Sequence, residues 1–360
     1  MSDSSSVPTR VVQWSTGNVG THALRCLIGH PDLELVGVIV HSDAKAGIDA
    51  GELCALPPTG VLTTTDIDAA LALAPDVVCY TAAGDLRPAE AVDDMARALR
   101  LGIDVISTSV VGLVWPPTAD PSLVATLDAA CTGGSSTCLT SGIDPGLAND
   151  LMPLVLSGFC ERIDSIRVME ILDYSTYEQA SVLFDIMGFG GSLDETPLLL
   201  LPGVLTSAWG GVISMMATAL GVELDEIREV HERRAATESF DISSGHVEVG
   251  TTAAMRFEIQ GIVAGRPAIV VEHVTRLRDQ DCPDWPRGNG MGSYRLIVEG
   301  SPRIECELTF EGADGDHNTG GLTATVMRLI NAIPDVRSSP PGVISTLDLP
   351  LVVGRGLVSR

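Results

Sequence analysis

VVQWSTGNVG, residues 11–20, decides the fold of the N-terminal part of the chain. Its apolar first half, Val11–Trp14, breaks at a short turn, and apolar residues resume with helical spacing from Val19 to Ile28. A second apolar run, Leu33–Val40, follows that helix. The order strand, glycine turn, helix, strand predicts a βαβ unit whose helix begins at the turn.

The pattern continues along the first 150 residues. Short apolar runs at Asp76–Ala82, Asp104–Val111 and Ser136–Ser141 have the length of strands that are buried on both faces. Helical segments separate them, which predicts right-handed crossovers and a parallel, doubly wound Rossmann sheet of the α/β class. The segments predicted as helices are Asp66–Leu73, Pro88–Leu101 and Pro121–Thr132.

Beyond residue 150 the strands become longer and alternate apolar with polar residues, beginning with Ile163–Leu172. Two hairpins are expected around the turns at 264–267 and 300–302. We therefore predict three parts: a Rossmann domain (1–150), an α+β domain with a mainly antiparallel sheet (151–320), and a C-terminal helix and tail (321–360). The hairpin strands are Ala253–Val263 with Ala268–Leu277, and Tyr294–Glu299 with Arg303–Phe310; helices are predicted at Gln179–Asp185, Val204–Arg234 and Leu322–Ala332.

Composition excludes several classes of protein. The chain has 360 residues, with 22 Lys and Arg against 47 Asp and Glu, a formal charge of −25 that argues against a nucleic-acid partner. Its apolar content of 45% is that of a packed globular protein. The eight cysteines show no metal-ligand spacing, so no metal is expected. The N-terminus lacks the apolar core of a signal peptide, and no run reaches the ~18 apolar residues of a membrane span, so a cytoplasmic protein is expected.

The turn after the first strand predicts a dinucleotide site. Gly17 would let the backbone approach a pyrophosphate, and Gly20 would let the helix pack closely on the sheet. The alternative is a tight turn in an α/β domain that binds no nucleotide. Small residues at the ends of later strands would border the ribose and nicotinamide, or serve tight turns only. The predicted cofactor-binding residues are Ser15, Thr16, Gly17, Asn18, Val19, Gly20, His41, Ser42, Lys45, Thr81, Ala82, Ala83, Ser107 and Thr108.

The end of the second strand indicates which dinucleotide is bound. Its first polar residues are His41 and Ser42, and Lys45, the only lysine of the chain, lies three residues beyond. An ammonium there suits a 2′-phosphate, so NADP is the expected cofactor, with NAD possible because Asp43 lies nearby. The alternatives are a solvated loop lysine and a packing role for His41.

With these motifs in view, the chain resembles the dihydrodipicolinate-reductase-like Rossmann enzymes, and more closely their branch of 2,4-diaminopentanoate dehydrogenase and native amine dehydrogenases. The resemblance runs nearly end to end. The stretches that carry it are residues 11–20, 41–53 (HSDAKAGIDAGEL), 141–150 (SGIDPGLAND), 170–177 (EILDYSTY), 187–190 (MGFG), and 331–336 with 340–350.

The resemblance implies a C-terminal segment that returns to the Rossmann domain, NAD(P) dependence and a homodimer. It also implies reversible hydride transfer to an imine carbon, with a glutamate after the fourth strand that handles protons. Here no carboxylate occurs between Asp104 and Asp120. Another group must take that role if the chemistry is kept.

Three residues are predicted as catalytic. Asp144 follows the fifth strand and precedes a proline, where it would contact substrate or nicotinamide amide, or else cap a helix. Asp173 and Tyr177 follow the first strand of the second domain, and a carboxylate near a phenol can relay a proton to a carbonyl oxygen. Their alternative is a hydrogen-bonded domain junction. The remaining candidates, His231, His246, His273 and His317, are assigned to structure or solvent.

Two functions follow from this sequence. The first is an NAD(P)-dependent oxidoreductase that transfers hydride to a C=N or C=O group of a small, fairly apolar substrate. The second is a dinucleotide-binding sensor or assembly subunit without catalysis, which the missing glutamate motivates.

Overall fold

A computed structural model describes residues 7–84 and 87–358, which form two compact units. One unit joins the chain up to Gly146 with the chain from Leu322 onward, and the other is Leu147–Gly321. The expectation of no signal peptide rests in part on residues 1–6, which lie outside the described residues. Among the helices that the structure describes, none is both long and apolar enough to traverse a lipid bilayer.

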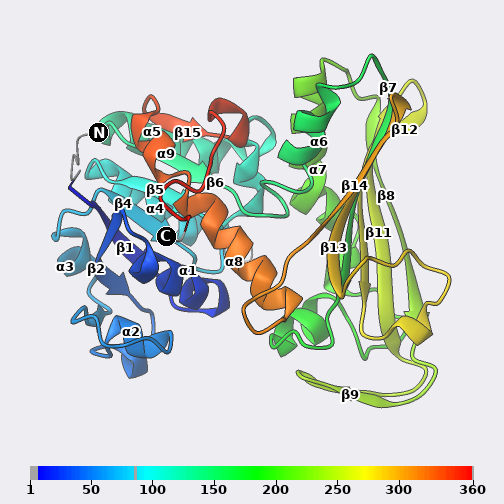
Figure 1. The fold of residues 1–360 in the computed structure, drawn as a ribbon, viewed down its shortest axis with the longest axis horizontal. Coiled ribbons are helices and arrows are strands. Elements are labelled where there is room, and N and C mark those ends of the chain that lie inside the picture. The colour runs from blue at the N-terminus through cyan, green and yellow to red at the C-terminus, as the bar shows by residue number, and fades with distance from the viewer. Residues whose placement is uncertain (1–6, 85–86, 359–360) are drawn as a thin grey trace. The chain divides into compact units, whose positions relative to one another are not determined.

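The first unit contains a parallel sheet in the order β15-β6-β5-β4-β1-β2-β3 (Figure 1). β1 is an interior strand that pairs with β2 on one side and β4 on the other, so the winding direction reverses there. The predicted doubly wound sheet is therefore confirmed. Its strands are β1 (Thr9–Trp14), β2 (Leu33–Ile39), β3 (Thr63–Thr64), β4 (Val77–Tyr80), β5 (Asp104–Ser107), β6 (Thr137–Thr140) and β15 (Gly342–Ile344).

Helices cover both faces of this sheet. α4 and α5 begin with proline, whose missing N–H costs nothing in a first helical turn. They pack with Trp14, Tyr80 and Leu99 in one buried cluster. On the other face α1 packs with the C-terminal helices around Leu27, Leu329 and Ile333. The helix bounds are α1 (Asn18–Gly29), α2 (Ala50–Leu53), α3 (Ile67–Leu71), α4 (Pro88–Arg100), α5 (Pro121–Gly134), α8 (His317–Ile330) and α9 (Ile333–Ser338).

The second unit contains a six-stranded sheet in the order β14-β13-β7-β12-β11-β8. Only the β12–β7 pair is parallel, so the expected mainly antiparallel sheet is confirmed. Helix α7 packs on one face of it. Bounds are α6 (Leu151–Ser157), α7 (Val204–Leu220), β7 (Arg162–Asp173), β8 (Glu226–Ala235), β9 (Phe240–Ile242), β10 (Gly245–Val247), β11 (Thr252–Val263), β12 (Arg266–Arg276), β13 (Gly292–Ser301) and β14 (Ile304–Thr309).

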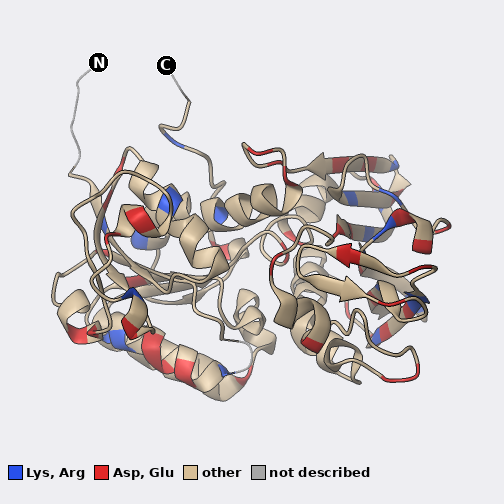
Figure 2. Ribbon diagram, turned by 90° about the horizontal axis from the view of Figure 1, so that it is seen from below, with Lys and Arg blue, Asp and Glu red and all other residues tan. Residues whose placement is uncertain are grey.

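The helix predicted over Val204–Arg234 is wrong in its second half. α7 ends at Leu220, because Gly221 adopts a left-handed conformation with φ 68°. The chain then forms β8, an edge strand that pairs with β11. Its charged residues favour helix by propensity, but charge on an edge strand is also what discourages pairing with other chains. Figure 2 shows both signs of charge along the strands of this unit.

The strand predicted over Asp104–Val111 is too long. β5 ends at Ser107, and Val110 lies in the left-handed region with φ 58°, which a β-branched residue rarely adopts. A short 3₁₀ turn, Val111–Val114, follows. The predicted helix Gln179–Asp185 appears as the π-helical turn Ser181–Ile186. Local sequence pattern does not reveal backbone conformations of this kind.

Candidate functional site

The turn between β1 and α1 has the conformation of a glycine-rich phosphate loop. Ser15 stands where such loops carry their first glycine, and it adopts the left-handed φ of 82°. A Cβ on Gly20 would lie 2.8 Å from the Thr81 hydroxyl oxygen and even closer to the carbonyl oxygen of Ser15. Helix α1 therefore approaches the end of β1 as closely as a glycine allows.

The side chain of the buried Gln13 on β1 holds this turn in place through hydrogen bonds. The Gln13 amide nitrogen donates to the carbonyl oxygen of Ser15 at 2.8 Å and to the Thr81 hydroxyl at 2.7 Å. Gln13 is fully buried, and Thr81 is nearly so. Gln13 is not among the predicted cofactor residues; its signal in the sequence is a polar residue inside an otherwise apolar strand.

The turn is accessible to solvent at Gly17, where the helix begins. Gly17 caps α1 and is exposed, no side chain caps the first turn of this 12-residue helix, and a Cβ on Gly17 would meet nothing within 4 Å. Backbone N–H groups at a helix N-terminus are donors suited to an anion. Asn18 and Val19 in the first turn are half-buried. The turn can thus accept a phosphate without displacing a side chain.

Lys45 reaches back to this turn from the segment after β2. Its ammonium donates to the Thr16 carbonyl oxygen at 2.8 Å and to the Thr16 hydroxyl at 3.3 Å. His41 and Ser42 are exposed at the end of β2, and the Ser42 hydroxyl accepts from the N–H of Ala44 at 3.3 Å. The structure thus brings Lys45 to Thr16, although 29 residues separate them.

The other predicted cofactor residues lie along the same edge of the sheet. Backbone hydrogen bonds join the ends of neighbouring strands there. The N–H of Thr81 donates to the carbonyl oxygen of Trp14 at 3.0 Å, and the N–H of Thr108 donates to the carbonyl oxygen of Tyr80 at 3.2 Å. Ala83 is exposed, whereas Ala82 and Ser107 are buried. The Ser107 hydroxyl accepts from the N–H of Ser109, whose own hydroxyl donates to the Ala82 carbonyl. Ser107 and Thr81 thus shape the edge through the backbone.

Asp144 is half-buried in a turn after β6 and does not cap a helix. The peptide bond to Pro145 is cis. The next helix, α6, begins at Leu151, and Asp150 caps it by accepting the N–H of that residue. The helix-cap alternative for Asp144 is therefore wrong.

Asp173 and Tyr177 lie in the second unit, where β7 ends. The Asp173 carboxylate accepts the N–H of Ser175 at 2.8 Å, and its backbone carbonyl oxygen lies 2.6 Å from Nε2 of His317. The Tyr177 hydroxyl donates to Gln179 at 2.7 Å, and its ring stacks on Tyr174 at 5.0 Å. Each side chain thus has a local hydrogen bond.

A buried polar group that sequence analysis did not assemble lies nearby in the same unit. The Tyr294 hydroxyl donates to one oxygen of Glu170 at 2.8 Å, and the other oxygen lies 3.2 Å from Nδ1 of His273. All three side chains are buried. The detectable signal was a polar residue interrupting an apolar alternation in each of three strands.

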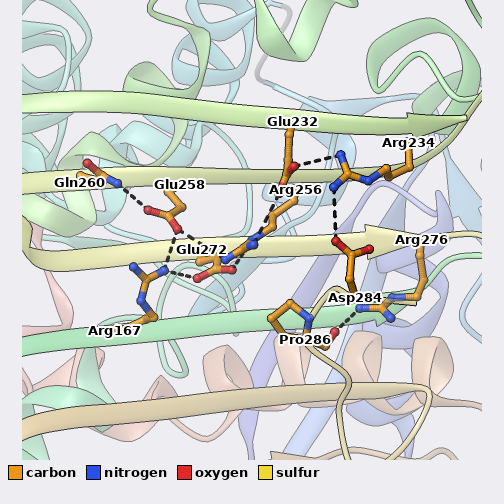
Figure 3. A network of polar contacts seen from close by, with 10 residues as sticks. All are labelled: Arg167, Glu232, Arg234, Arg256, Glu258, Gln260, Glu272, Arg276, Asp284 and Pro286. Atoms are coloured by element: carbon orange, nitrogen blue, oxygen red, sulfur yellow. Dashed lines mark hydrogen bonds and ion pairs between the residues drawn. The ribbon is translucent and has the colours of Figure 1, made fainter. Parts of the chain in front are cut away.

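The opposite face of this sheet carries a network of ion pairs (Figure 3). Glu272 is fully buried, and its carboxylate contacts Arg167 and, at 2.7 Å, Nε of Arg256. Burial acts to raise the pKa of Glu258, but hydrogen bonds from Arg167 and Gln260 outweigh it and hold that pKa below its ordinary value. The ion-pair network and the group of Glu170, His273 and Tyr294 therefore lie on opposite faces of the same sheet.

Comparison with known proteins finds relatives that are all amine or diaminopentanoate dehydrogenases among those described below. The model of the 2,4-diaminopentanoate dehydrogenase C-terminal domain matches residues 147–357. An amine dehydrogenase of Streptomyces virginiae is 46% identical over 355 residues, which is 97% of this chain and 98% of that protein. The 2,4-diaminopentanoate dehydrogenase of Acetoanaerobium sticklandii is 25% identical over 265 residues, 73% of this chain and 70% of that protein.

A solved structure shares the whole fold. The amine dehydrogenase from Mycobacterium smegmatis superposes with a TM-score of 0.78 at 19% identity, covering 96% of this chain and 97% of the other. At that identity the likeness concerns the fold alone.

Proposed function

Because this chain belongs to the 2,4-diaminopentanoate dehydrogenase family and is an oxidoreductase, we propose that it transfers hydride between a nicotinamide dinucleotide and a C=N or C=O group of a small, fairly apolar substrate. The observation that carries the proposal is the turn at Ser15–Gly20. Its left-handed Ser15, open Gly17 and tightly packed Gly20 fit the pyrophosphate of a dinucleotide.

In this proposal the first unit holds the cofactor. The N–H groups at the start of α1 hold the pyrophosphate, Gln13 and Thr81 keep the turn in shape, and the edge from Thr81 to Thr108 borders the ribose and nicotinamide. The dinucleotide, when bound, supplies or accepts the hydride. The acidic chain binds this anion locally, through backbone donors, without a positive net charge.

Three further assignments belong to this proposal. The second unit provides substrate contacts, with Asp144 on the first unit and Asp173 and Tyr177 on the second as predicted contacts. For Asp173 and Tyr177 this requires that their present hydrogen bonds be exchanged for bonds to substrate. The domain limits at residues 150 and 320 and the homodimer stay predictions.

An activity panel tests the proposed function. The purified chain would be titrated with NADPH and NADH by intrinsic fluorescence and then assayed at 340 nm against small ketones and aldehydes, with and without ammonia, and against primary amines in reverse. We expect binding and turnover. Binding without turnover on any substrate would support the inactive sensor instead, and failure to bind either dinucleotide would refute both functions.

We propose NADP as the preferred cofactor, and Lys45→Ala tests this. Loss of a charge-assisted hydrogen bond should weaken NADPH binding about 10- to 100-fold, with a much smaller effect on NADH. The position of the ammonium beside Thr16 supports the assignment. Dissociation constants for both cofactors give the answer, with Lys45→Arg as the charge-preserving control. Equal losses for the two cofactors would remove the 2′-phosphate role.

A further inference from the structure

Glu170, His273 and Tyr294 form a polar group on an apolar sheet face. They lie on β7, β12 and β13 and pair at one level of the sheet, since Glu170 is opposite His273 on one side and Tyr294 on the other. Side chains two residues apart share a face, and this is the face on which α7 packs. Their neighbours on it are Val168, Leu172, Val271, Thr275, Gly292 and Leu296.

The group has a defined geometry. Each oxygen of Glu170 has its own partner, the Tyr294 hydroxyl at 2.8 Å and Nδ1 of His273 at 3.2 Å. An ionised carboxylate only accepts hydrogen bonds, so a catalytic role for ionised Glu170 requires the hydrogen on Nδ1 of His273. These two partners from flanking strands fix the plane of the carboxylate.

Aromatic rings surround the group. The His273 ring stacks on Phe257 at 4.6 Å and 11°, and Trp209 of α7 contacts both rings, with centroids 4.5 Å and 5.3 Å away. Tyr294 meets Phe310 edge to face at 5.9 Å. Electrostatic interactions are stronger in such an apolar setting than in water, and aromatic faces also attract cations.

Burying a carboxylate costs free energy, because the charge loses its hydration. Most neighbouring positions on this face hold apolar residues, so packing of the sheet does not itself require a carboxylate at position 170. Glu170 would also supply a negative charge that the proposed chemistry requires. An iminium or ammonium group requires a counter-charge in a dry site, and the segment from Val105 to Ala119 contains no carboxylate.

We propose that Glu170 is the catalytic carboxylate, which holds the substrate nitrogen as a cation and moves its proton, while His273 and Tyr294 position it. This rests on the proposed function. It goes further in assigning the binding of the substrate cation and the transfer of its proton to one residue of this chain.

The proposed step balances as follows in the direction of amine oxidation. An N–H bond of the bound ammonium breaks and an O–H bond forms on Glu170, which leaves a neutral amine. The carboxylic acid then releases this proton to water, which restores the carboxylate. The α-carbon transfers a hydride, which is a proton with two electrons, to the oxidised dinucleotide, and the resulting iminium lies beside the carboxylate. Water hydrolyses the iminium to a carbonyl compound and an ammonium ion.

The experiment uses the full chain and four variants, Glu170→Gln, Glu170→Asp, Tyr294→Phe and the control Glu258→Gln. Glu258 is a partly buried carboxylate of the same sheet, on its opposite face. Calorimetry with small primary alkylamines, in the presence of oxidised dinucleotide, reports substrate binding without turnover. Assays at 340 nm report kcat and KM, and fluorescence reports dinucleotide affinity.

Glu170→Gln should weaken amine binding about 10- to 100-fold, the loss expected for a hydrogen bond to a charged group, and lower kcat by about 100-fold or more. Dinucleotide affinity should not change. Glu170→Asp should recover part of the amine affinity, because it keeps the charge. Tyr294→Phe should lower kcat about 10-fold with little change in KM, because it loosens the carboxylate without removing it.

The inference is overturned if Glu170→Gln binds amines and turns them over within threefold of the wild type. It is also overturned if the variants differ from the wild type only in a lower melting temperature. It is also overturned if the wild type binds dinucleotide but no amine. Failure of the wild type to bind dinucleotide at all would instead refute the proposed function. The two failures are therefore distinguishable.

Discussion

Gly20→Ala is expected to abolish dinucleotide binding and to destabilise the protein. The added Cβ would lie 2.8 Å from the Thr81 hydroxyl oxygen and overlap the carbonyl oxygen of Ser15, which is backbone and cannot rotate away. Helix α1 must therefore move off the end of β1. Overpacking of this kind costs about 1–3 kcal/mol, and a displacement near 1 Å at a binding turn costs on the order of 100-fold in function.

Gly17→Ala is the matched control three residues away. Gly17 has φ −72° and ψ −164°, which alanine adopts freely, and its Cβ would contact no protein atom within 4 Å. The free energy of unfolding of the Gly17→Ala variant should change by about 0.5 kcal/mol or less. Alanine is less favourable than glycine as a helix N-cap, but it also lowers the entropy of the unfolded chain, and the two effects oppose each other. Dinucleotide affinity should nevertheless fall about 10-fold, because the methyl group takes the space of the phosphate.

Urea unfolding and NADPH and NADH titration of both variants check this contrast. Gly20→Ala with wild-type affinity would mean that the turn does not bind the cofactor. Gly17→Ala with wild-type affinity would mean that the phosphate does not approach the helix from the open side.

Glu272→Gln is expected to produce the largest loss of stability among the ion-pair variants, about 3 kcal/mol, provided that no new hydrogen bonds replace the charge. The carboxylate is fully buried between Arg167 and Arg256, so its neutralisation removes the buried counter-charge that both guanidinium groups contact. Arg167 then keeps Glu258, and Arg256 keeps Glu258 and Glu232, all of which are more exposed than Glu272. Water reaches both arginines to some extent, which is why we place the loss at the lower end of the range for buried pairs.

The control is Glu226→Gln, which breaks an exposed pair with Arg228 at one end of the edge strand β8. Exposed pairs contribute about 0–1 kcal/mol, and salt screens them. Urea unfolding at low and high salt should show a large, salt-insensitive loss for Glu272→Gln and a small one for Glu226→Gln. Equal losses would mean that the network in Figure 3 contributes no more than surface charge.

Local pattern predicted most of the first unit because its elements are short and mutually consistent. Proline at the start of α4 and α5 and the apolar runs of β1 and β4 each indicate one conformation. β8 was mistaken for helix because its charged residues have helical propensity, and only pairing with β11 makes it a strand. β15 was missed because three residues carry no periodicity, and its place beside β6 depends on contacts some 200 residues away.

The sequence by itself determined the candidate cofactor turn, because its signal is local: a strand, a turn and a helix within the 21 residues of Thr9–Gly29. Only the tertiary structure brought Lys45 to Thr16 and joined Glu170 to His273 and Tyr294, which are 103 and 124 residues away. The physical reason is strand register. A slip of one residue in any of three strands would turn one member of the group to the opposite face, and register depends on the packing of the whole sheet.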